Sequence, residues 1–216
     1  MNHNEYLETW YPLIVDKGLV GAVKRKIHNL LERGHAESIE KLLELGIGHG
    51  QHVRHVKQAV KEYHAIDLQD FLPNGVRKSV IFHQGDAHNL QKFSENSFDR
   101  LVATCLIVHL DDPETALKEW RRVVKVGGSI DLWVPCEMGI TLRVAQNIST
   151  RRKLKQINLD YDSLQWREHR NHFPMIRTLI KDIFKYDQIT FSAIPFTRLP
   201  WDLQLVRTYR ITKIKI

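Results

Sequence analysis

The sequence has few cysteines, and the two that it has do not form a recognisable pair. Cys105 and Cys136 lie far apart in apolar surroundings, and neither belongs to a CxxC motif. A disulfide framework or a structural zinc site requires more cysteines at closer spacing. The sequence therefore predicts neither feature, and it fits a reducing compartment.

Long hydrophobic runs are absent too. No apolar stretch approaches the ~20 residues that a bilayer-spanning helix needs. The first ten residues contain asparagine, histidine and glutamate in place of the basic and apolar regions of a signal peptide. We therefore expect a cytoplasmic protein without a membrane span.

Repeats and low-complexity segments are also missing. The sequence is 43% hydrophobic and 26% charged, which is typical of a folded domain. Its 216 residues suffice for a core without disulfides or metal. We expect one domain over residues 1–216, as a monomer or homodimer, with cap helices at 1–34 and a cap insertion at 138–173. The net charge of +7 favours an anionic partner, either a phosphorylated small molecule, a lipid headgroup or a nucleic acid.

The pattern of apolar residues predicts an α/β fold with a doubly wound parallel sheet. Five short apolar runs alternate with helical or mixed segments, at 41–45, 63–67, 79–82, 98–104 and 129–135. Helices are expected at 5–33, directly after the glycines of 46–50, from 112 to a stop at 127–128, at 142–156 and at 173–184. Two further strands, 187–194 and 202–212, are joined by a short loop with two prolines, which favours an antiparallel pair at the sheet edge.

The first strand ends in a glycine-rich turn with the sequence GIGHG, residues 46–50. Closely spaced glycines let the backbone approach a ligand, and a following helix would offer free N–H groups to a nucleotide-like molecule. The spacing is GxGxG, since Gln51 stands where a dinucleotide-binding turn has its third glycine. Asp67, at the end of the second strand, can accept hydrogen bonds from both hydroxyls of a ribose.

Five sequence blocks together resemble class I methyltransferases that use S-adenosylmethionine (SAM), in the group similar to the ubiquinone-pathway C-methyltransferases. The blocks are LELGIGHG (43–50), AIDLQ (65–69), QGDAHNL (84–90), FDRLVATCLIVHL (98–110) and LKEWRRVVKVGGSI (117–130). The resemblance is closest over residues 41–135. It implies SAM as the cofactor and a Rossmann-like sheet of seven strands in the order 3-2-1-4-5-7-6, with strand 7 antiparallel.

The resemblance also implies how the first two blocks would bind SAM. Gly46, Gly48 and Gly50 would shape the pocket for its methionine part. Glu44 would lie beside that pocket, and Asp67 would bind the ribose.

Residues of the later blocks would complete the SAM site. Leu68 would pack on the adenine, Asp86 would accept a hydrogen bond from its amino group, and Ala87 would lie beside its edge. Thr104 and Cys105 would line the methionine side.

Candidate residues for the acceptor come from segments that are expected over the carboxyl ends of the strands. His169 and His172 are candidates for a general base or an acceptor clamp, because histidine is the residue type best suited to exchange protons at neutral pH. His109 is the reserve candidate: it matches the second histidine of an HH pair common in the family, whose first position is Val108 here. The predicted acceptor contacts are Tyr6, Tyr11, Arg167 and Arg170. Surface polar residues before a helix are the alternative interpretation of the segment 167–172.

We expect methyl transfer to an oxygen, or as a second choice a nitrogen, of a polar and anionic small molecule such as a phosphorylated or nucleotide-linked sugar. Two other classes stay open. The isoelectric point near 9.4 favours a nucleic-acid methyltransferase, although residues 103–106 read ATCL where such enzymes carry Asn/Asp-Pro-Pro-Tyr. The other class is a partner protein that binds SAM without turnover.

The sequence predicts no metal site, because no set of histidine, cysteine and aspartate has ligand spacing on a single predicted element. Methyl transfer should therefore run equally well with and without EDTA. An activity that EDTA abolishes and a divalent ion restores would contradict this prediction.

Overall fold

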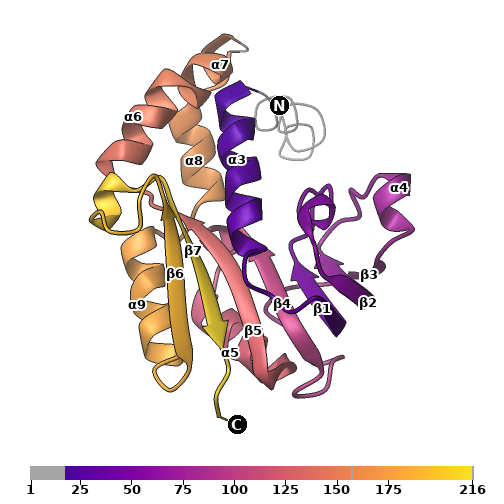
Figure 1. Ribbon diagram of the computed structural model, residues 1–216. Coiled ribbons are helices and arrows are strands. Elements are labelled where there is room, and N and C mark those ends of the chain that lie inside the picture. Colours follow the sequence, from indigo (N-terminus) through magenta and orange to yellow (C-terminus); the bar gives the residue numbers. More distant parts are fainter. Residues whose placement is uncertain (1–17, 157, 216) are drawn as a thin grey trace.

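The computed structural model describes residues 18–156 and 158–215. Seven strands form one sheet in the order β3-β2-β1-β4-β5-β7-β6 (Figure 1). Their bounds are β1 Ser38–Leu45, β2 Ala59–Asp67, β3 Ile81–Gln84, β4 Phe98–Thr104, β5 Val124–Pro135, β6 Gln188–Ile194 and β7 Val206–Thr212. The first five strands pair in parallel, whereas β7 is antiparallel to both β5 and β6. Order and direction confirm the predicted sheet.

Helices lie on both faces of this sheet. They are α3 Gly18–Leu31, α4 Asn74–Arg77, α5 Pro113–Val123, α6 Ile140–Ile148, α7 Thr150–Gln156, α8 Tyr161–Glu168 and α9 Phe173–Ile183, with 3-10 turns η2 Val53–His55, η3 Ile107–His109 and η4 Trp201–Leu203. α5 begins as predicted, because the Asp112 carboxylate accepts a hydrogen bond from the backbone N–H of Thr115 at 3.0 Å. None of these helices is long and apolar enough to cross a membrane.

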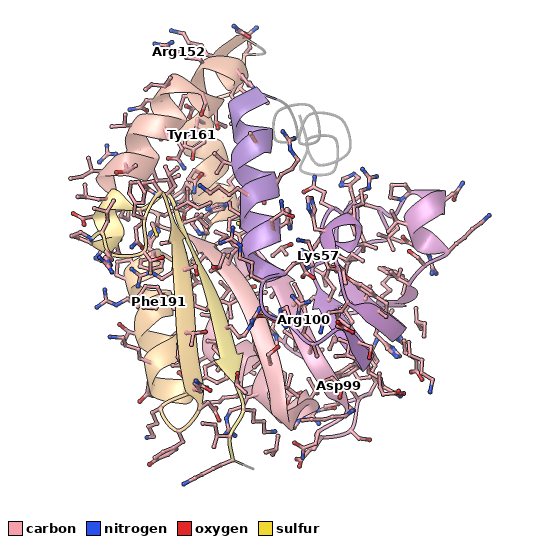
Figure 2. The ribbon with its side chains drawn as sticks, in the orientation of Figure 1. Lys57, Asp99, Arg100, Arg152, Tyr161 and Phe191 are labelled. Atoms are coloured by element: carbon pink, nitrogen blue, oxygen red, sulfur yellow. The ribbon has the colours of Figure 1, made fainter. Side chains whose placement is uncertain are left out.

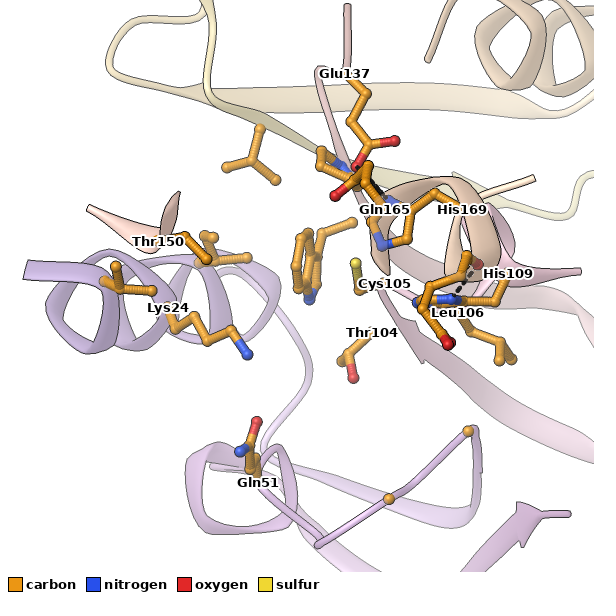
Figure 3. A pocket seen from close by; sticks show the side chains of 18 of the residues that line it. Lys24, Gln51, Thr104, Cys105, Leu106, His109, Glu137, Thr150, Gln165 and His169 are labelled. Atoms are coloured by element: carbon orange, nitrogen blue, oxygen red, sulfur yellow. Dashed lines mark hydrogen bonds and ion pairs between the residues drawn. The ribbon is translucent and has the colours of Figure 1, made fainter. Parts of the chain in front are cut away.

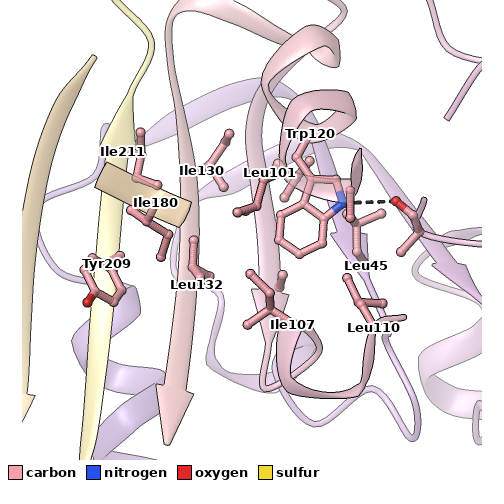
Figure 4. Packing of buried hydrophobic residues seen from close by; sticks show 14 of the residues in the cluster. Leu45, Leu101, Ile107, Leu110, Trp120, Ile130, Leu132, Ile180, Tyr209 and Ile211 are labelled. Atoms are coloured by element: carbon pink, nitrogen blue, oxygen red, sulfur yellow. Dashed lines mark hydrogen bonds between the residues drawn. The ribbon is translucent and has the colours of Figure 1, made fainter. Parts of the chain in front are cut away.

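The main hydrophobic core lies between the sheet and the helices α5 and α9. Trp120 of α5 is the largest fully buried side chain, and its indole N–H donates to the carbonyl oxygen of Ala87 at 3.0 Å (Figure 4). A smaller cluster on the other face packs Ile27 and Leu31 of α3 against Trp133 of β5. The central strands are therefore covered on both faces, as in other doubly wound sheets.

The prediction of a helix directly after the glycine turn is wrong. Residues 51–58 form a loop with the single turn η2, and β2 begins at Ala59 instead of residue 63. Ala59 and Val60 pair with Ser38 and Ile39 of β1, so they belong to the sheet. The early start of β2 takes up residues that the predicted helix would have needed. The apolar residues that suggested a helical face are valines that pack on a cluster around β1 and β2 instead.

The boundary between α5 and β5 also differs from the prediction. α5 ends at Val123 and β5 begins at the next residue, so Gly127 and Gly128 lie inside the strand and do not stop the helix. Val124 pairs with Phe98 of β4, and a register shift follows where Gly127 adopts a φ of 81°. The two glycines therefore mark an irregularity in a strand, which is their other common role.

Two smaller corrections concern the cap segment and β3. The segment 142–156, predicted as one helix, contains two helices, α6 and α7. They are separated by Ser149, whose φ of −112° and ψ of −81° are not helical. β3 begins at Ile81 and not at residue 79. The segment 138–173 contains α6, α7 and α8, and its action as a cap stays a prediction. Any helix before α3 lies outside the described residues.

A buried network of charged residues connects α3 to the sheet. Arg100 of β4 donates to Asp131 of β5 at 2.8 Å and to Glu32, just after α3, at 2.7 Å. All three side chains are at most 1% exposed. Burial on its own would raise the pKa of the Glu32 carboxyl, but hydrogen bonds from His52 and Arg100 outweigh it and hold that pKa well below its usual range.

The same network includes the loop after the glycine turn and the strand β7. The Gln58 side chain accepts from Arg100 at 3.0 Å, and the Lys57 backbone N–H donates to Glu32 at 3.1 Å. Arg210 of β7 donates to the second oxygen of Asp131 at 2.8 Å. Figure 2 shows Arg100 near the lower end of α3, with the Lys57 segment beside it. These contacts fix the loop of residues 51–58, which stands where the sequence predicted a helix.

Replacing Arg100 by methionine should lower the free energy of unfolding by about 3–5 kcal/mol, because two buried carboxylates would lose their main partner. Urea unfolding measured by circular dichroism tests this. The matched control is Lys118→Met, which breaks an exposed pair with Glu114 and should cost less than about 1 kcal/mol. Equal losses in the two variants would show that the network does not stabilise the fold.

Candidate functional site

The described residues enclose a cavity of about 970 Å³. It lies at the carboxyl ends of β1, β2, β4 and β5, between α3 on one side and α6, α7 and α8 on the other. Open α/β sheets bind their ligands at this edge. The volume is at the upper end of the roughly 300–1,000 Å³ of small-molecule sites. The cavity therefore has room for a nucleotide-like ligand together with a second small molecule.

The glycine turn forms one wall of the cavity. Gly46, Gly48 and Gly50 have φ values of 64°, 52° and 68°, a region that only glycine adopts freely. A Cβ at Gly46 would lie 2.8 Å from a methyl group of Leu106, whereas one at Gly48 would meet no atom within 4 Å. The backbone at Gly48 therefore faces open space, into which a ligand can come close.

Asp67 lies at the end of β2 and connects to this turn. Its Oδ2 accepts a hydrogen bond from the backbone N–H of Gly48 at 2.8 Å. Burial raises the pKa of Asp67, and the backbone hydrogen bonds oppose that change only in part. Leu68 follows with 64% of its surface exposed, and both residues line the cavity. They stand where the resemblance placed the ribose and the adenine.

Asp86 and Ala87 line the same end of the cavity, after β3. Asp86 accepts hydrogen bonds from the backbone N–H of His88 at 2.9 Å and from its ring at 2.6 Å. Burial opposes ionisation of Asp86, but the two hydrogen bonds and the charge interaction with His88 together outweigh it and lower the pKa of Asp86. Asp86 is thus held as a carboxylate acceptor at the cavity.

Glu44 lies in β1, two residues before the glycine turn beside which the resemblance placed it. It is fully buried in β1 and is not one of the residues that line the cavity. Its Oε2 accepts from the Tyr63 hydroxyl at 2.6 Å, while Oε1 has no partner. Burial raises the pKa of Glu44. Its place beneath the glycine turn supports that turn, and its contact with SAM stays a prediction.

Thr104 and Cys105 line the cavity at the end of β4. Cys105 has a φ of 61°, a strained value for a residue with a side chain. Burial raises the pKa of its thiol to about 12. A thiol of this kind is neutral and a poor nucleophile at neutral pH, so it serves as part of the wall.

A histidine paired with a buried carboxylate stands on the cap side of the cavity. The Nδ1–H of His169 donates to the Oε1 of Glu137, and the amide of Gln165 donates to the same oxygen at 2.7 Å. Glu137 follows β5 directly and is 5% exposed. In the tautomer with the proton on Nδ1, the Nε2 of His169 is the ring nitrogen that can accept a proton. Figure 3 shows Glu137, Gln165 and His169 together, across the cavity from Lys24.

His109 lies next to this pair. Its ring stands edge-on to that of His169 with the centroids 4.7 Å apart, and its Nδ1–H donates to the carbonyl oxygen of Glu168 at 2.7 Å. The Asn171 amide donates to the carbonyl oxygens of Ile107 and Leu110, at 3.0 and 2.6 Å. These bonds fix η3 against the end of α8, so that both histidines line the cavity.

Other predicted acceptor residues are not brought to the cavity. His172 is exposed at the start of α9 and does not line it. Arg167 faces a shallow pocket beside Trp166, and Arg170 pairs with Asp111 on the surface. Tyr6 and Tyr11 lie outside the described residues.

Lys24, Trp133 and Glu137 are among the lining residues that the sequence-based prediction missed. The indole N–H of Trp133 and the Oε2 of Glu137 are buried without a hydrogen-bond partner within the described ranges. Such atoms indicate places where a ligand can bind. One signal for Glu137 was available, since a carboxylate directly after a buried parallel strand belongs to the ligand edge of the sheet.

Comparison with known families gives one sequence match. Residues 43–131 match the family described as methyltransferase domain. A search of curated proteins found no match. The matched segment runs from the first glycine block into β5 and contains the cavity wall formed by the glycine turn, Asp67, Asp86 and Cys105.

Solved structures share the fold over nearly the whole chain. A Thermotoga maritima SAM-dependent methyltransferase, described as a possible histamine N-methyltransferase, has a TM-score of 0.63 at 19% identity, covering 97% of this chain and 95% of that one. The Haemonchus contortus phosphoethanolamine N-methyltransferase 2, in complex with S-adenosylhomocysteine (SAH), has a TM-score of 0.63 at 15% identity over 99% of this chain and 59% of that one. The [4+2]-cyclase SpnF has a TM-score of 0.63 at 14% identity, over 93% and 84%. At such identities these likenesses establish the fold alone.

The residues at the glycine end fit SAM. The open space at Gly48 admits a ligand against the backbone, and Asp67 and Asp86 supply acceptors for hydroxyl and amino groups. The unpartnered Trp133 N–H offers a buried donor, and Lys24 brings a positive charge to the cavity for a carboxylate.

Replacing Asp67 by alanine should weaken SAM binding by ~1.5 to 3 kcal/mol, the range for hydrogen bonds to a charged group. Titration calorimetry with SAH measures this. Asp70→Ala is the matched control, because Asp70 is exposed, pairs with Arg77 and does not line the cavity. Unchanged affinity in the Asp67 variant would refute the assignment of this carboxylate to SAM.

Proposed function

We propose that this chain is a class I SAM-dependent methyltransferase that methylates a hydroxyl or amine of a small molecule, with His169 as the general base. The observation that carries the proposal is the hydrogen bond between His169 and the buried Glu137 at the cavity wall. An acceptor of either kind must lose a proton as the new bond forms. The experiment that tests this assignment is described below.

SAM, when bound, supplies a methyl group on a positively charged sulfur. The glycine turn, Asp67 and Asp86 hold the donor, and Lys24 and Trp133 complete its surroundings. Their task is orientation, because methyl transfer is an in-line displacement whose rate depends on alignment. A donor fixed at this end leaves the cap side of the cavity to the acceptor.

His169 removes the proton from the acceptor. The Nε2 of His169 takes the proton of the acceptor O–H or N–H, and the imidazole becomes an imidazolium. Glu137 stabilises this cation through the hydrogen bond to Nδ1, and it also keeps the neutral ring in the tautomer with a free Nε2. Gln165 holds Glu137 in position. His109 packs against His169 and limits its rotation.

The charges around the cavity favour a neutral acceptor over the anionic one that the net charge suggested. The carboxylates that line it are Asp67, Asp86, Glu137 and Glu168. Within the described ranges Lys24 is the one lysine among the lining residues, and no arginine is present. A phosphorylated substrate would meet repulsion from Glu137 and Glu168 without a guanidinium to bind it. A nucleic acid, which needs several phosphate contacts, is disfavoured for the same reason.

Replacing His169 by alanine should lower kcat by ~10² to 10⁴, the contribution of a positioned base. SAH affinity, measured by calorimetry, should stay within twofold because His169 is remote from the glycine end. Methyl transfer can be followed with radiolabelled SAM and a panel of phenols, alcohols and amines.

His172→Ala is the matched control, since this histidine is exposed and does not line the cavity. It should leave kcat within about twofold. If the His169 variant also keeps kcat within about tenfold, below the range for a positioned base, the proton leaves by another route and the proposal fails.

A further inference from the structure

Helix α6 has an apolar stripe that none of the core clusters formed by the described residues covers. Ile140, Val144 and Ile148 lie four residues apart on one face, and they are 60%, 51% and 60% exposed. No residue of α6 is buried. Apolar residues at this spacing normally face a core, so a stripe that remains open indicates a binding surface.

The stripe belongs to the cavity that contains the candidate active site. All three residues line it, together with Val20 and Val23 of α3 on the opposite side. Leu154 of α7 adds a further apolar side chain. The apolar wall is therefore continuous with the site where His169 and Glu137 stand.

Charged side chains of the same two helices point elsewhere. α6 and α7 carry five basic residues, and none of them lines the cavity. These are Arg143, Arg151, Arg152, Lys153 and Lys155. The residues that α6 and α7 do contribute to the cavity are apolar or uncharged polar ones. A helix pair rich in charge thus presents an uncharged face to the ligand.

We propose that this stripe binds the hydrocarbon part of the methyl acceptor, which is an amphiphile with a hydroxyl or amine head at His169. The inference rests on the proposed function, since it concerns the acceptor of the same reaction. From Ile140 to Ile148 the helix advances about 12 Å, at about 1.5 Å per residue. The acceptor body is therefore an alkyl, prenyl or aromatic group of about this length.

Chain-length dependence of binding tests the proposal without turnover. Full-length protein saturated with SAH is titrated with 1-hexanol, 1-octanol and 1-decanol in a calorimeter. Affinity should rise about fourfold per methylene, the value expected for burial of hydrocarbon. Affinities that do not change with chain length, in protein that binds SAH normally, would overturn the proposal.

Substitutions on the two faces of α6 supply the matched comparison. Val144→Gln and Ile148→Gln should each weaken decanol binding about tenfold, whereas Arg143→Gln on the outer face should not. SAH affinity should be the same in all three variants. The proposal would be wrong if the stripe variants bound decanol as tightly as the unmodified protein. If their melting temperature also fell while decanol still bound, the stripe would pack against protein instead.

These outcomes separate the inference from the function on which it rests. Failure of the unmodified protein to bind SAH would remove the proposed function itself. Normal SAH binding and methyl transfer to short polar acceptors, without any gain from a longer chain, would remove only the hydrocarbon site.

Discussion

The buried guanidinium of Arg100 is the constraint on which the arrangement of the elements depends. A guanidinium has five N–H groups and keeps its charge in the interior, so it must be surrounded by acceptors. Asp131, Glu32, Gln58 and the Leu31 carbonyl provide them. They come from β5, from the end of α3 and from the loop before β2. One residue of β4 therefore ties three segments that are distant in sequence, and Arg210 extends the connection to β7.

This network explains how a SAM-binding turn is supported without a helix behind it. The helix that would usually follow the glycines is replaced by a loop whose backbone and side chains bond to Glu32 and Arg100. His52 of that loop contacts Glu32 at 3.2 Å, beneath the turn. No helix of the described residues therefore points its positive end at this position, and the groups that face the cavity here are the turn's backbone and the carboxylates of Asp67 and Asp86.

The cavity itself is divided by polarity. Its glycine end has carboxylates and backbone N–H groups, its middle has two histidines and Glu137, and the α6 side has apolar residues. Such a division suits the proposed polar donor and less polar acceptor, which would meet at His169. The lysines and arginines of α6 and α7 contribute to the basic isoelectric point, and none of them lines the cavity.

The sheet and much of the cavity wall could be predicted from the sequence, because these features depend on local patterns. Apolar runs of strand length, the Asp112-Pro113 helix start and the glycine turn act within a few residues of each other, and all appear in the structure. Only the tertiary structure decided the rest. Whether residues 51–58 form a helix depended on pairing between Ala59 and Ser38 and on the Arg100 network, which join distant segments. Likewise, the choice of His169 over His172 depended on a carboxylate, Glu137, that is 32 positions away in the sequence and reaches His169 only after β5 and α8 have packed.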